Sequence, residues 1–147
     1  MYKRVVSYLD KLSIITDNQF GFRSKHSTSH ALLLLTEKIR KSIDQGLYTC
    51  GIFLDLCKAF DTVDHSILLD KLSNYGIRGK AHEWFSSYLN NRRQFVSIGS
   101  SNSDILPVRC GVPQGSVLGP LLFLIYVNDF QKCSDLLEFH LFADDTN

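Results

Sequence analysis

The sequence predicts a layered fold that mixes helices and strands, of the α+β or the α/β class. Segments with apolar residues at every third or fourth position, typical of helices, alternate along the chain with short apolar runs typical of strands. The 147 residues are 44% hydrophobic and 21% charged, which suffices for one buried core. This composition excludes a disordered, collagen-like or low-complexity chain.

The first predicted elements are a helix and a strand. Residues 28–45 carry an apolar stripe at helical spacing, with Ser27 or Thr28 as the N-cap and Gly46 as the stop signal. Residues 48–56 form a β-rich run that is apolar on both faces. Such a run is typical of a central strand that is covered on both sides.

The middle of the chain predicts two helices followed by two strands. Residues 66–75 and 80–89 have the helical pattern. Residues 93–99 and 104–110 are predicted strands, and the polar segment 100–103 is predicted as the turn between them.

A helix and a strand are also predicted in the last third. The helix follows Gly115 and Ser116, and it can contain Pro120 only in its first turn, because proline has no N–H to donate. Residues 136–142 alternate between apolar and polar side chains, as a half-buried strand does.

Charge and composition exclude several classes of protein and identify none. Sixteen basic and fifteen acidic residues give a formal net charge of +1, so no overall basic field indicates a nucleic-acid partner. The N-terminus lacks a signal-peptide pattern and the longest apolar run, 117–127, is too short to span a bilayer, so we expect no membrane association. The four cysteines form no C-x-x-C pair, and we expect free thiols in a reducing compartment.

Three aspartates stand at positions where charge is unexpected. Asp55 lies inside the apolar run 52–56, where burying a carboxylate costs several kcal/mol unless it is compensated. Asp144 and Asp145 end a second apolar strand, where adjacent like charges repel each other. If the two strands are neighbours in one sheet, the carboxylates converge, and a divalent cation would compensate both burial and repulsion. Mg²⁺ suits such a site, and two ions could align a phosphoryl transfer.

Less specific interpretations of the same aspartates stay open. An Asp-Asp pair after a strand is commonly a solvated turn or a helix cap. Asp55 could accept backbone hydrogen bonds or form an ion pair with Lys58.

Four segments in order resemble the core motifs of reverse transcriptases, especially those of non-LTR retrotransposons of the jockey type. Phe53–Asp61 is similar to the family's first-aspartate motif, and Gly111–Phe123 to its Pro-Gln-Gly motif. Phe142–Asp145 resembles its paired-aspartate motif, and Gln19–Arg23 resembles a preceding motif of the fingers.

The resemblance implies the fingers-palm portion of a right-hand polymerase, an α+β fold with an antiparallel palm sheet packed on helices. Residues 1–47 would belong to the fingers and 48–147 mainly to the palm. Compared with the family pattern the chain looks truncated at both ends, with the thumb absent and the hairpin strand after the paired aspartates missing. Cys57 stands where relatives usually carry serine.

The resemblance also implies the catalytic residues. Asp55, Asp144 and Asp145 would be the catalytic, metal-binding carboxylates, joined by the main-chain carbonyl of Leu56. They would hold two Mg²⁺ ions, with Mn²⁺ as an alternative ion.

Further residues would bind the nucleotide and the nucleic acid. By resemblance Arg23 contacts the triphosphate, Phe60 excludes a ribose 2′-hydroxyl, and Gln114 and Gly115 lie beside the incoming nucleotide. Arg92 and Arg93 could contact the nucleic-acid backbone. Plainer interpretations stay open for all of them. Arg23 could be a solvated arginine and Phe60 a core aromatic. The segment with Gln114 and Gly115 could be a loop with an N-cap, and Arg92 and Arg93 could be a charged turn.

The implied function is that of an RNA-directed DNA polymerase fragment, which transfers deoxynucleotidyl groups from dNTPs to a DNA primer 3′-hydroxyl on an RNA template. We expect the chain to be inactive alone, since without a thumb few phosphate contacts hold the duplex. The alternative is a catalytically inactive remnant that only binds nucleic acid or protein. Oligomeric state and compartment are unknown; the resemblance points to an intracellular location, with the nucleus as one candidate.

Overall fold

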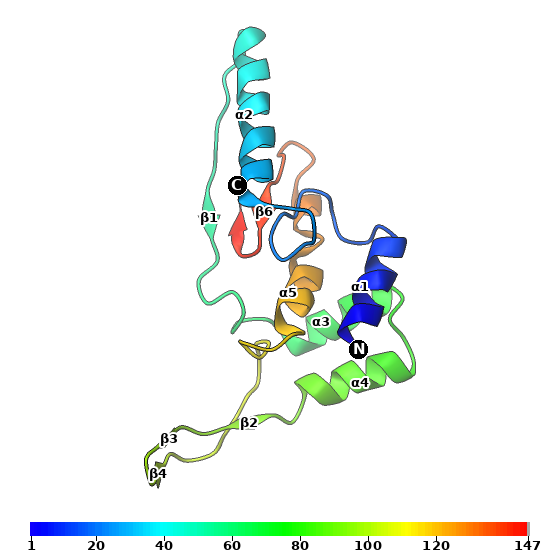
Figure 1. Cartoon of the computed structure of the whole chain (residues 1–147), viewed down its shortest axis with the longest axis vertical. Helices are drawn as coiled ribbons and strands as arrows, with labels where there is room; N and C mark the ends of the chain where they lie inside the picture. Colours follow the sequence, from blue (N-terminus) through cyan, green and yellow to red (C-terminus); the bar gives the residue numbers. More distant parts are fainter. Residues whose placement is uncertain (147) are drawn as a thin grey trace. The chain divides into compact units, whose positions relative to one another are not determined.

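The structure is a computed structural model that describes residues 1–146 (Figure 1). The described chain has a mixed α+β composition of helices and short antiparallel strand pairs, which confirms the predicted class. It divides into two compact units: unit 1 comprises residues 1–59 and 127–146, and unit 2 is Phe60–Tyr126. The expected boundary between fingers and palm near residue 47 comes from the family resemblance and not from compactness, and it stays a prediction.

Unit 1 contains two helices and a small sheet. The helices are α1 (Tyr2–Lys11) and α2 (Thr28–Asp44), and a short 3-10 helix, η1, spans Phe130–Cys133. The strands β1 (Leu54–Asp55), β6 (Leu141–Phe142) and β7 (Asp145–Thr146) form an antiparallel sheet in the order β1-β7-β6. Figure 1 shows the extended chain around β1 descending from the end of α2, and the β6–β7 hairpin in red.

The helices of unit 1 follow local sequence signals. The predicted helix 28–45 is confirmed as α2, and the Ser27 hydroxyl accepts the hydrogen bond from the His30 amide as its N-cap. The sequence did not predict α1, although Val5 and Leu9 have the helical spacing of four residues and are its buried side chains.

The predicted central strand 48–56 is wrong in extent and environment. Only Leu54 and Asp55 pair in a sheet, and residues 46–55 are all exposed. The physical reason is that β1 is an edge strand with one partner, β7, over two residues. Asp55 is therefore not a buried carboxylate, and the expected cost of burying it does not arise.

The expected absence of a hairpin strand after the paired aspartates is also wrong. Asp145 and Thr146 form β7, which turns back on β6 with Phe142 paired to Asp145. Since β7 lies between β6 and β1, the two predicted strands 48–56 and 136–142 are not direct neighbours, and Asp55 of β1 pairs with Asp145 of β7.

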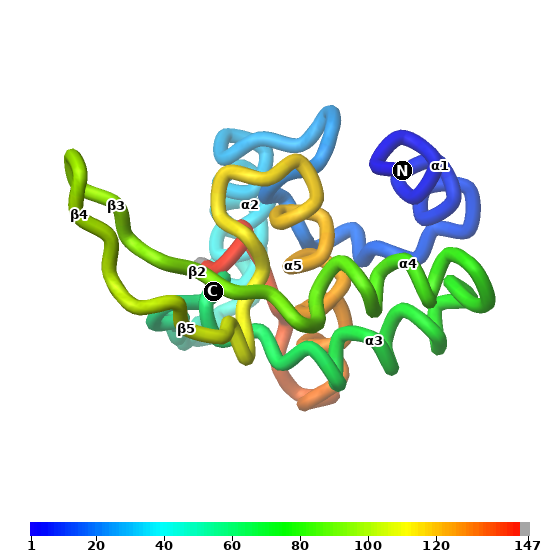
Figure 2. The backbone as a smooth tube through the Cα atoms, turned by 90° about the horizontal axis from the view of Figure 1, so that it is seen from below, coloured from blue at the N-terminus to red at the C-terminus, as the bar shows by residue number. Residues whose placement is uncertain are grey.

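Unit 2 contains a pair of helices and an extended arm. Helices α3 (His65–Asn74) and α4 (Lys80–Leu89) match the predictions and lie side by side (Figure 2). The His82 ring of α4 forms a hydrogen bond with the Leu69 carbonyl oxygen of α3 at 3.1 Å. Helix α5 (Gly119–Val127) holds Pro120 in its first turn, as predicted. Its buried residues lie on all sides, and its last residue belongs to unit 1.

The arm is a long hairpin made of four two-residue strands. β2 (Arg93–Gln94) pairs with β5 (Leu106–Pro107), and β3 (Ser97–Ile98) pairs with β4 (Ser101–Asn102). The prediction of two strands joined by a turn is thus confirmed, but the strands are shorter than 93–99 and 104–110. The turn is Gly99–Ser100, with Gly99 at φ +59°, and not the whole of 100–103.

The described residues contain no helix that is both long and apolar enough to span a bilayer. All four cysteines are exposed thiols.

Candidate functional site

The pairing of β1 with β7 brings the three predicted aspartates together in the backbone. Asp55 is the register partner of Asp145, and Asp144 is the residue before Asp145 in the hairpin turn. Paired residues of antiparallel strands have Cα atoms about 4.5–5.5 Å apart. Residues separated by nearly ninety positions in sequence therefore lie at one edge of one small sheet.

The carboxylates of Asp55 and Asp144 are available to a ligand. Asp55 is exposed and Asp144 is half-buried. Neither carboxylate accepts a hydrogen bond or forms an ion pair within the described part of the chain. The side chain of Asp145 lies outside the described part of the structure.

The turn that carries Asp144 is held by the segment 18–21. Ala143, the first residue of the turn, has φ +58°, a left-handed conformation that is uncommon for residues other than glycine. Its amide donates to Oε1 of Gln19 at 3.0 Å. Gly21 lies so close that a Cβ added there would be 2.3 Å from the Ala143 nitrogen.

Arg23 is also in unit 1, where its guanidinium contacts main-chain oxygens. Nη1 donates to the carbonyl of Thr16 at 2.6 Å and to that of Gln19 at 3.5 Å, and Nη2 lies 3.7 Å from the Asp17 carboxylate. The Arg23 side chain is only 18% exposed, so it is not a solvated surface arginine. Its expected contact with a triphosphate stays a prediction.

Phe60 belongs to unit 2 and packs as an aromatic of that unit. Its ring stacks on Phe123 of α5 with 4.5 Å between centroids and 27° between planes, and the residue is half-buried. The stack agrees with the plainer interpretation of a packed aromatic. Exclusion of a ribose hydroxyl by Phe60 stays a prediction.

The Pro-Gln-Gly segment of unit 2 is a loop fixed to the start of that unit. Gly111 donates to the Val63 carbonyl and Val112 to the Phe60 carbonyl, each at 2.8 Å, and the His65 Nε2 bonds the Gly111 oxygen at 2.7 Å. These bonds fix Gly111 and Val112, and the turn at residues 114–115 follows them.

Gln114 and Gly115 are the exposed tip of this loop. The Gln114 amide donates to the Asp61 carboxylate at 3.1 Å. Gly115 has φ +73° with no atom within 4 Å of an added Cβ, so the space beside it is open. The Ser116 hydroxyl accepts from the amide of Gly119, the first residue of α5, at 2.9 Å.

Arg92 and Arg93 lie at the base of the arm of unit 2. Both are exposed, and the Arg92 guanidinium lies 5.6 Å from the ring centroid of Tyr88. Arg93 is the first residue of β2. Contact of this pair with nucleic acid stays a prediction.

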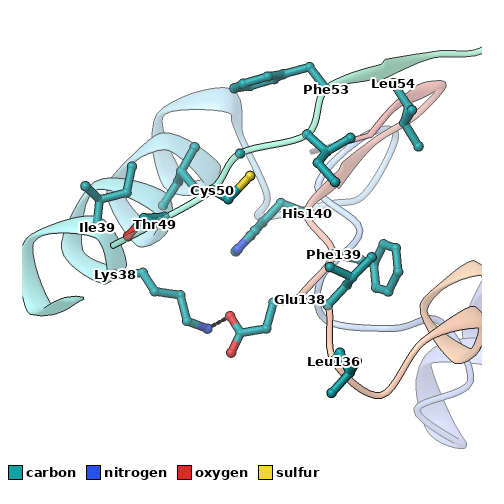
Figure 3. Close-up of a pocket in the computed structure, with 14 residues that line it drawn as sticks. Lys38, Ile39, Thr49, Cys50, Phe53, Leu54, Leu136, Glu138, Phe139 and His140 are labelled. Atoms are coloured by element: carbon teal, nitrogen blue, oxygen red, sulfur yellow. Dashed lines mark ion pairs between the residues drawn. The ribbon is translucent and has the colours of Figure 1, made fainter. Parts of the chain in front are cut away.

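Unit 1 also contains a pocket of about 480 Å³, which holds none of the predicted site residues (Figure 3). Apolar residues of α2, of 49–54 and of 136–140 line it, and a Lys38–Glu138 ion pair lies beside it. His140 faces into it, and burial, with a smaller contribution from Lys38, lowers the pKa of the His140 ring.

Sequence reasoning missed three buried polar residues that hold these loops. Gln19 is 1% exposed, His65 is 7% exposed and Asn128 is 7% exposed. Asn128 accepts from the Thr16 amide at 2.9 Å and donates to the Ile14 carbonyl at 2.8 Å. Gln19 and Asn128 lie outside helices and His65 is only the first residue of α3, so no periodic pattern distinguishes them from solvated side chains.

The donor atoms at the β1–β7 edge fit a hard divalent cation. Mg²⁺ prefers carboxylate and carbonyl oxygens, and it commonly takes only one or two carboxylates from the protein. Among the side chains that the structure describes, which do not include that of Asp145, no three His, Cys, Asp or Glu form a ready-made metal cluster. The two described carboxylates, both without a partner there, can supply ligands of that kind.

Comparison with known proteins identifies the family. The sequence profile described as "Reverse transcriptase (RNA-dependent DNA polymerase)" matches residues 1–147. The chain is 37% identical over 132 residues to the probable RNA-directed DNA polymerase from transposon BS of Drosophila melanogaster, with 86% of this chain and 14% of that protein covered.

Two further relatives from Drosophila melanogaster agree. The probable RNA-directed DNA polymerase from transposon X-element is 39% identical over 129 residues, covering 88% of this chain and 14% of its own length. The RNA-directed DNA polymerase from mobile element jockey is 33% identical over 150 residues, with 97% of this chain and 16% of that protein covered. The chain thus spans about one seventh of the length of these curated relatives.

Reverse transcriptases use divalent metal ions, nucleic acid and dNTPs, so the oxygen donors at the β1–β7 edge agree with the family chemistry. With the profile matched along the whole sequence, the chain belongs to the reverse transcriptase family, and its relatives are enzymes of non-LTR retrotransposons.

Proposed function

We propose that this chain forms the fingers-palm part of a retrotransposon reverse transcriptase, which extends a DNA primer on an RNA template. The observation that supports this most is the register of Asp55 with Asp145. It brings the first-aspartate strand and the paired-aspartate hairpin to one sheet edge.

In this proposal the metal ligands are Asp55, Asp144 and Asp145, together with the Leu56 carbonyl. The carboxylates of Asp55 and Asp144 can bind cations without breaking a hydrogen bond or ion pair, since these carboxylates have none within the described part of the chain. The Leu56 carbonyl already accepts from the Ala59 amide at 3.2 Å, and a carbonyl oxygen has a second lone pair for a cation. Two bound Mg²⁺ or Mn²⁺ ions would stabilise charge on the attacking and leaving oxygens of the transfer.

The other predicted residues would bind and select the nucleotide. Arg23 would contact the triphosphate, Phe60 would oppose the ribose 2′ position, and Gln114 with Gly115 would border the nucleotide. The open space beside Gly115 and the packed ring of Phe60 are compatible with these roles. Arg92 and Arg93 would add phosphate contacts, since guanidinium groups suit phosphate oxygens.

Primer extension on an RNA template with Mg²⁺ tests the proposal. The proteins are the wild-type chain, Asp144→Ala and Asp44→Ala, each also prepared with whatever sequence the gene encodes beyond Asn147. Asp44 is the matched control, an exposed carboxylate at the end of α2 in the same unit. We expect extension by the longer wild type and by Asp44→Ala, and a loss of about 100-fold or more in Asp144→Ala.

Two results would contradict the proposal in different ways. Absence of extension by every protein, the longer ones included, would favour the alternative of an inactive remnant that only binds nucleic acid or protein. Full activity in Asp144→Ala would refute the assignment of the site.

A further inference from the structure

We infer that Gln19 is a positioning residue that fixes the Asp144–Asp145 hairpin so that its aspartates can bind metal together with Asp55. The inference rests on the proposed function, because it concerns the same metal site. Gln19 is not one of the proposed metal ligands. Its side chain instead bonds to the main chain of the turn that carries Asp144.

Gln19 bonds directly to the turn that carries Asp144. Its side chain is 1% exposed, and Oε1 accepts two main-chain hydrogen bonds, from the Gly21 amide at 2.8 Å and the Ala143 amide at 3.0 Å. Ala143 immediately precedes Asp144 and has φ +58°. A left-handed residue of this kind persists when its surroundings hold it, and the Gln19 bond is one such restraint.

The main chain on both sides of Gln19 is bonded to β6. The Leu141 amide donates to the Asn18 carbonyl at 2.8 Å, and the Phe20 amide donates to the Leu141 carbonyl at 2.7 Å. These two bonds make a parallel bridge between Gln19 and Leu141. One segment therefore holds the hairpin by its first strand and by its turn.

Gly21 limits the position of the turn from the other side. An added Cβ at Gly21 would lie 2.3 Å from the Ala143 nitrogen and 2.9 Å from its Cα. Only a residue without a side chain permits this approach. The turn therefore has little freedom to move toward segment 18–21 or away from it.

Segment 18–21 is itself anchored within unit 1, so it does not simply follow the hairpin. The Thr16 hydroxyl donates to the Gln131 side-chain oxygen at 2.8 Å, and Asn128 bonds the main chain of Ile14 and Thr16. Arg23 returns to the Thr16 carbonyl at 2.6 Å. These part-buried bonds tie residues 14–16, which lead into the segment, to Asn128, Gln131 and Arg23.

The side-chain oxygen of Gln19 holds the hairpin turn, and its side-chain nitrogen does not. Among the described residues, the buried Nε2 has no hydrogen-bond partner. A variant that keeps an acceptor oxygen should therefore retain the turn. A variant that removes it leaves two buried amides unsatisfied, which is the costly case.

The test measures Mn²⁺ affinity by electron paramagnetic resonance of the free ion in the full 147-residue chain. We expect Gln19→Leu to weaken Mn²⁺ binding about tenfold or more, the usual effect of residues that orient metal ligands. Gln19→Glu, which keeps the acceptor, should stay within about threefold of wild type. The side chain of Gln19→Asn is one methylene shorter, which moves the acceptor oxygen away from the two amides, so this variant should weaken Mn²⁺ binding as Gln19→Leu does. It replaces Gln19→Leu in the test if the leucine variant does not fold. Circular dichroism at the same temperature verifies folding.

Two controls separate positioning from general stability and from the proposed function. His82→Leu removes a half-buried bond between α4 and α3 in unit 2 and should leave Mn²⁺ affinity unchanged. Asp144→Ala should abolish the site. Binding that disappears in Asp144→Ala but is unaltered in the folded Gln19→Leu or Gln19→Asn variant would overturn the role of Gln19 and leave the proposed function intact. Absence of Mn²⁺ binding to wild type, or binding unaffected by Asp144→Ala, would overturn the metal site and this inference with it.

Discussion

Asp55 is an exposed residue whose register partner on the neighbouring strand, Asp145, is also an aspartate. Directly opposed like charges destabilise a strand pair, by an amount on the order of 0.2–1 kcal/mol. A bound divalent cation reverses this effect, because it converts repulsion into shared coordination. The same residue should therefore weaken the metal-free sheet and strengthen the metal-bound one.

This reversal predicts opposite effects of Asp55→Asn without and with metal. Without metal the variant should unfold at the same temperature as wild type or slightly above it. With Mg²⁺ at about 100 times its dissociation constant, the free energy of unfolding should rise by about 2.7 kcal/mol in wild type and not in the variant. Thermal unfolding followed by circular dichroism measures both. Asp44→Asn, the exposed-carboxylate control, should respond to Mg²⁺ as wild type does, and equal shifts in wild type and Asp55→Asn would refute the prediction.

The sequence singles out the three aspartates, whose role as metal ligands stays a prediction, but it carries no signal for the residues that hold them. Asp55, Asp144 and Asp145 stand out because charge interrupts apolar runs, and that signal is local. Burial of Gln19 depends on contacts with residues more than a hundred positions away, such as Ala143. No pattern within one sequence reports such a contact.

Among the elements, helix α3 shows how a local signal fixes a boundary. Asp64 is its N-cap, and its Oδ1 accepts from the amides of Ser66 at 2.8 Å and Ile67 at 3.0 Å. The hydrogen bond from the Ser66 hydroxyl, followed by that from the Ile67 amide, lowers the pKa of Asp64 below its ordinary value of 3.8. The ionised carboxylate is thus favoured in the folded helix.

This lowered pKa predicts a pH-dependent contribution of Asp64 to stability. Because the folded pKa lies below the unfolded one, the stabilisation is present above about pH 4 and is lost as the pH falls through the folded pKa. Asp64→Ala should unfold at a lower temperature than wild type at pH 7, and the difference should shrink toward pH 3. Asp64→Asn keeps a cap oxygen that does not titrate, so its difference from Asp64→Ala should persist at pH 3. A gap between wild type and Asp64→Ala that is the same at both pH values would contradict the prediction.

Helices α2 to α5 were predicted closely, α1 was missed, and the strands were predicted too long, for a physical reason. Caps and stop signals such as Ser27, Asp64 and Gly76 act within one turn of the helix they bound. A strand is defined by its partner, and β1 pairs with residues ninety positions away over only two residues. The apolar run 48–56 therefore indicated a covered strand where the described chain has an exposed edge.

In the whole molecule the predicted site residues divide between the two compact units. Unit 1 carries Asp55, Asp144 and Arg23, and unit 2 carries Phe60, Gln114, Gly115, Arg92 and Arg93. Ordered motifs therefore predicted the family, which the full-length match confirms, while the relation between motifs in different units comes from resemblance alone. Within unit 1, by contrast, the register of β1 with β7 is a property of the fold.

The central claim is that a divalent ion binds at the edge where β1 meets β7, and iron-directed cleavage tests it most directly. Fe²⁺ accepts carboxylate ligands and, with ascorbate and peroxide, cuts the backbone beside the site where it binds. We predict cuts near residues 54–56 and 143–146 of the wild-type chain, suppressed by excess Mg²⁺ and lost in Asp144→Ala but not in Asp44→Ala. Cleavage confined to other segments, or the same two cuts in Asp144→Ala, would contradict the account.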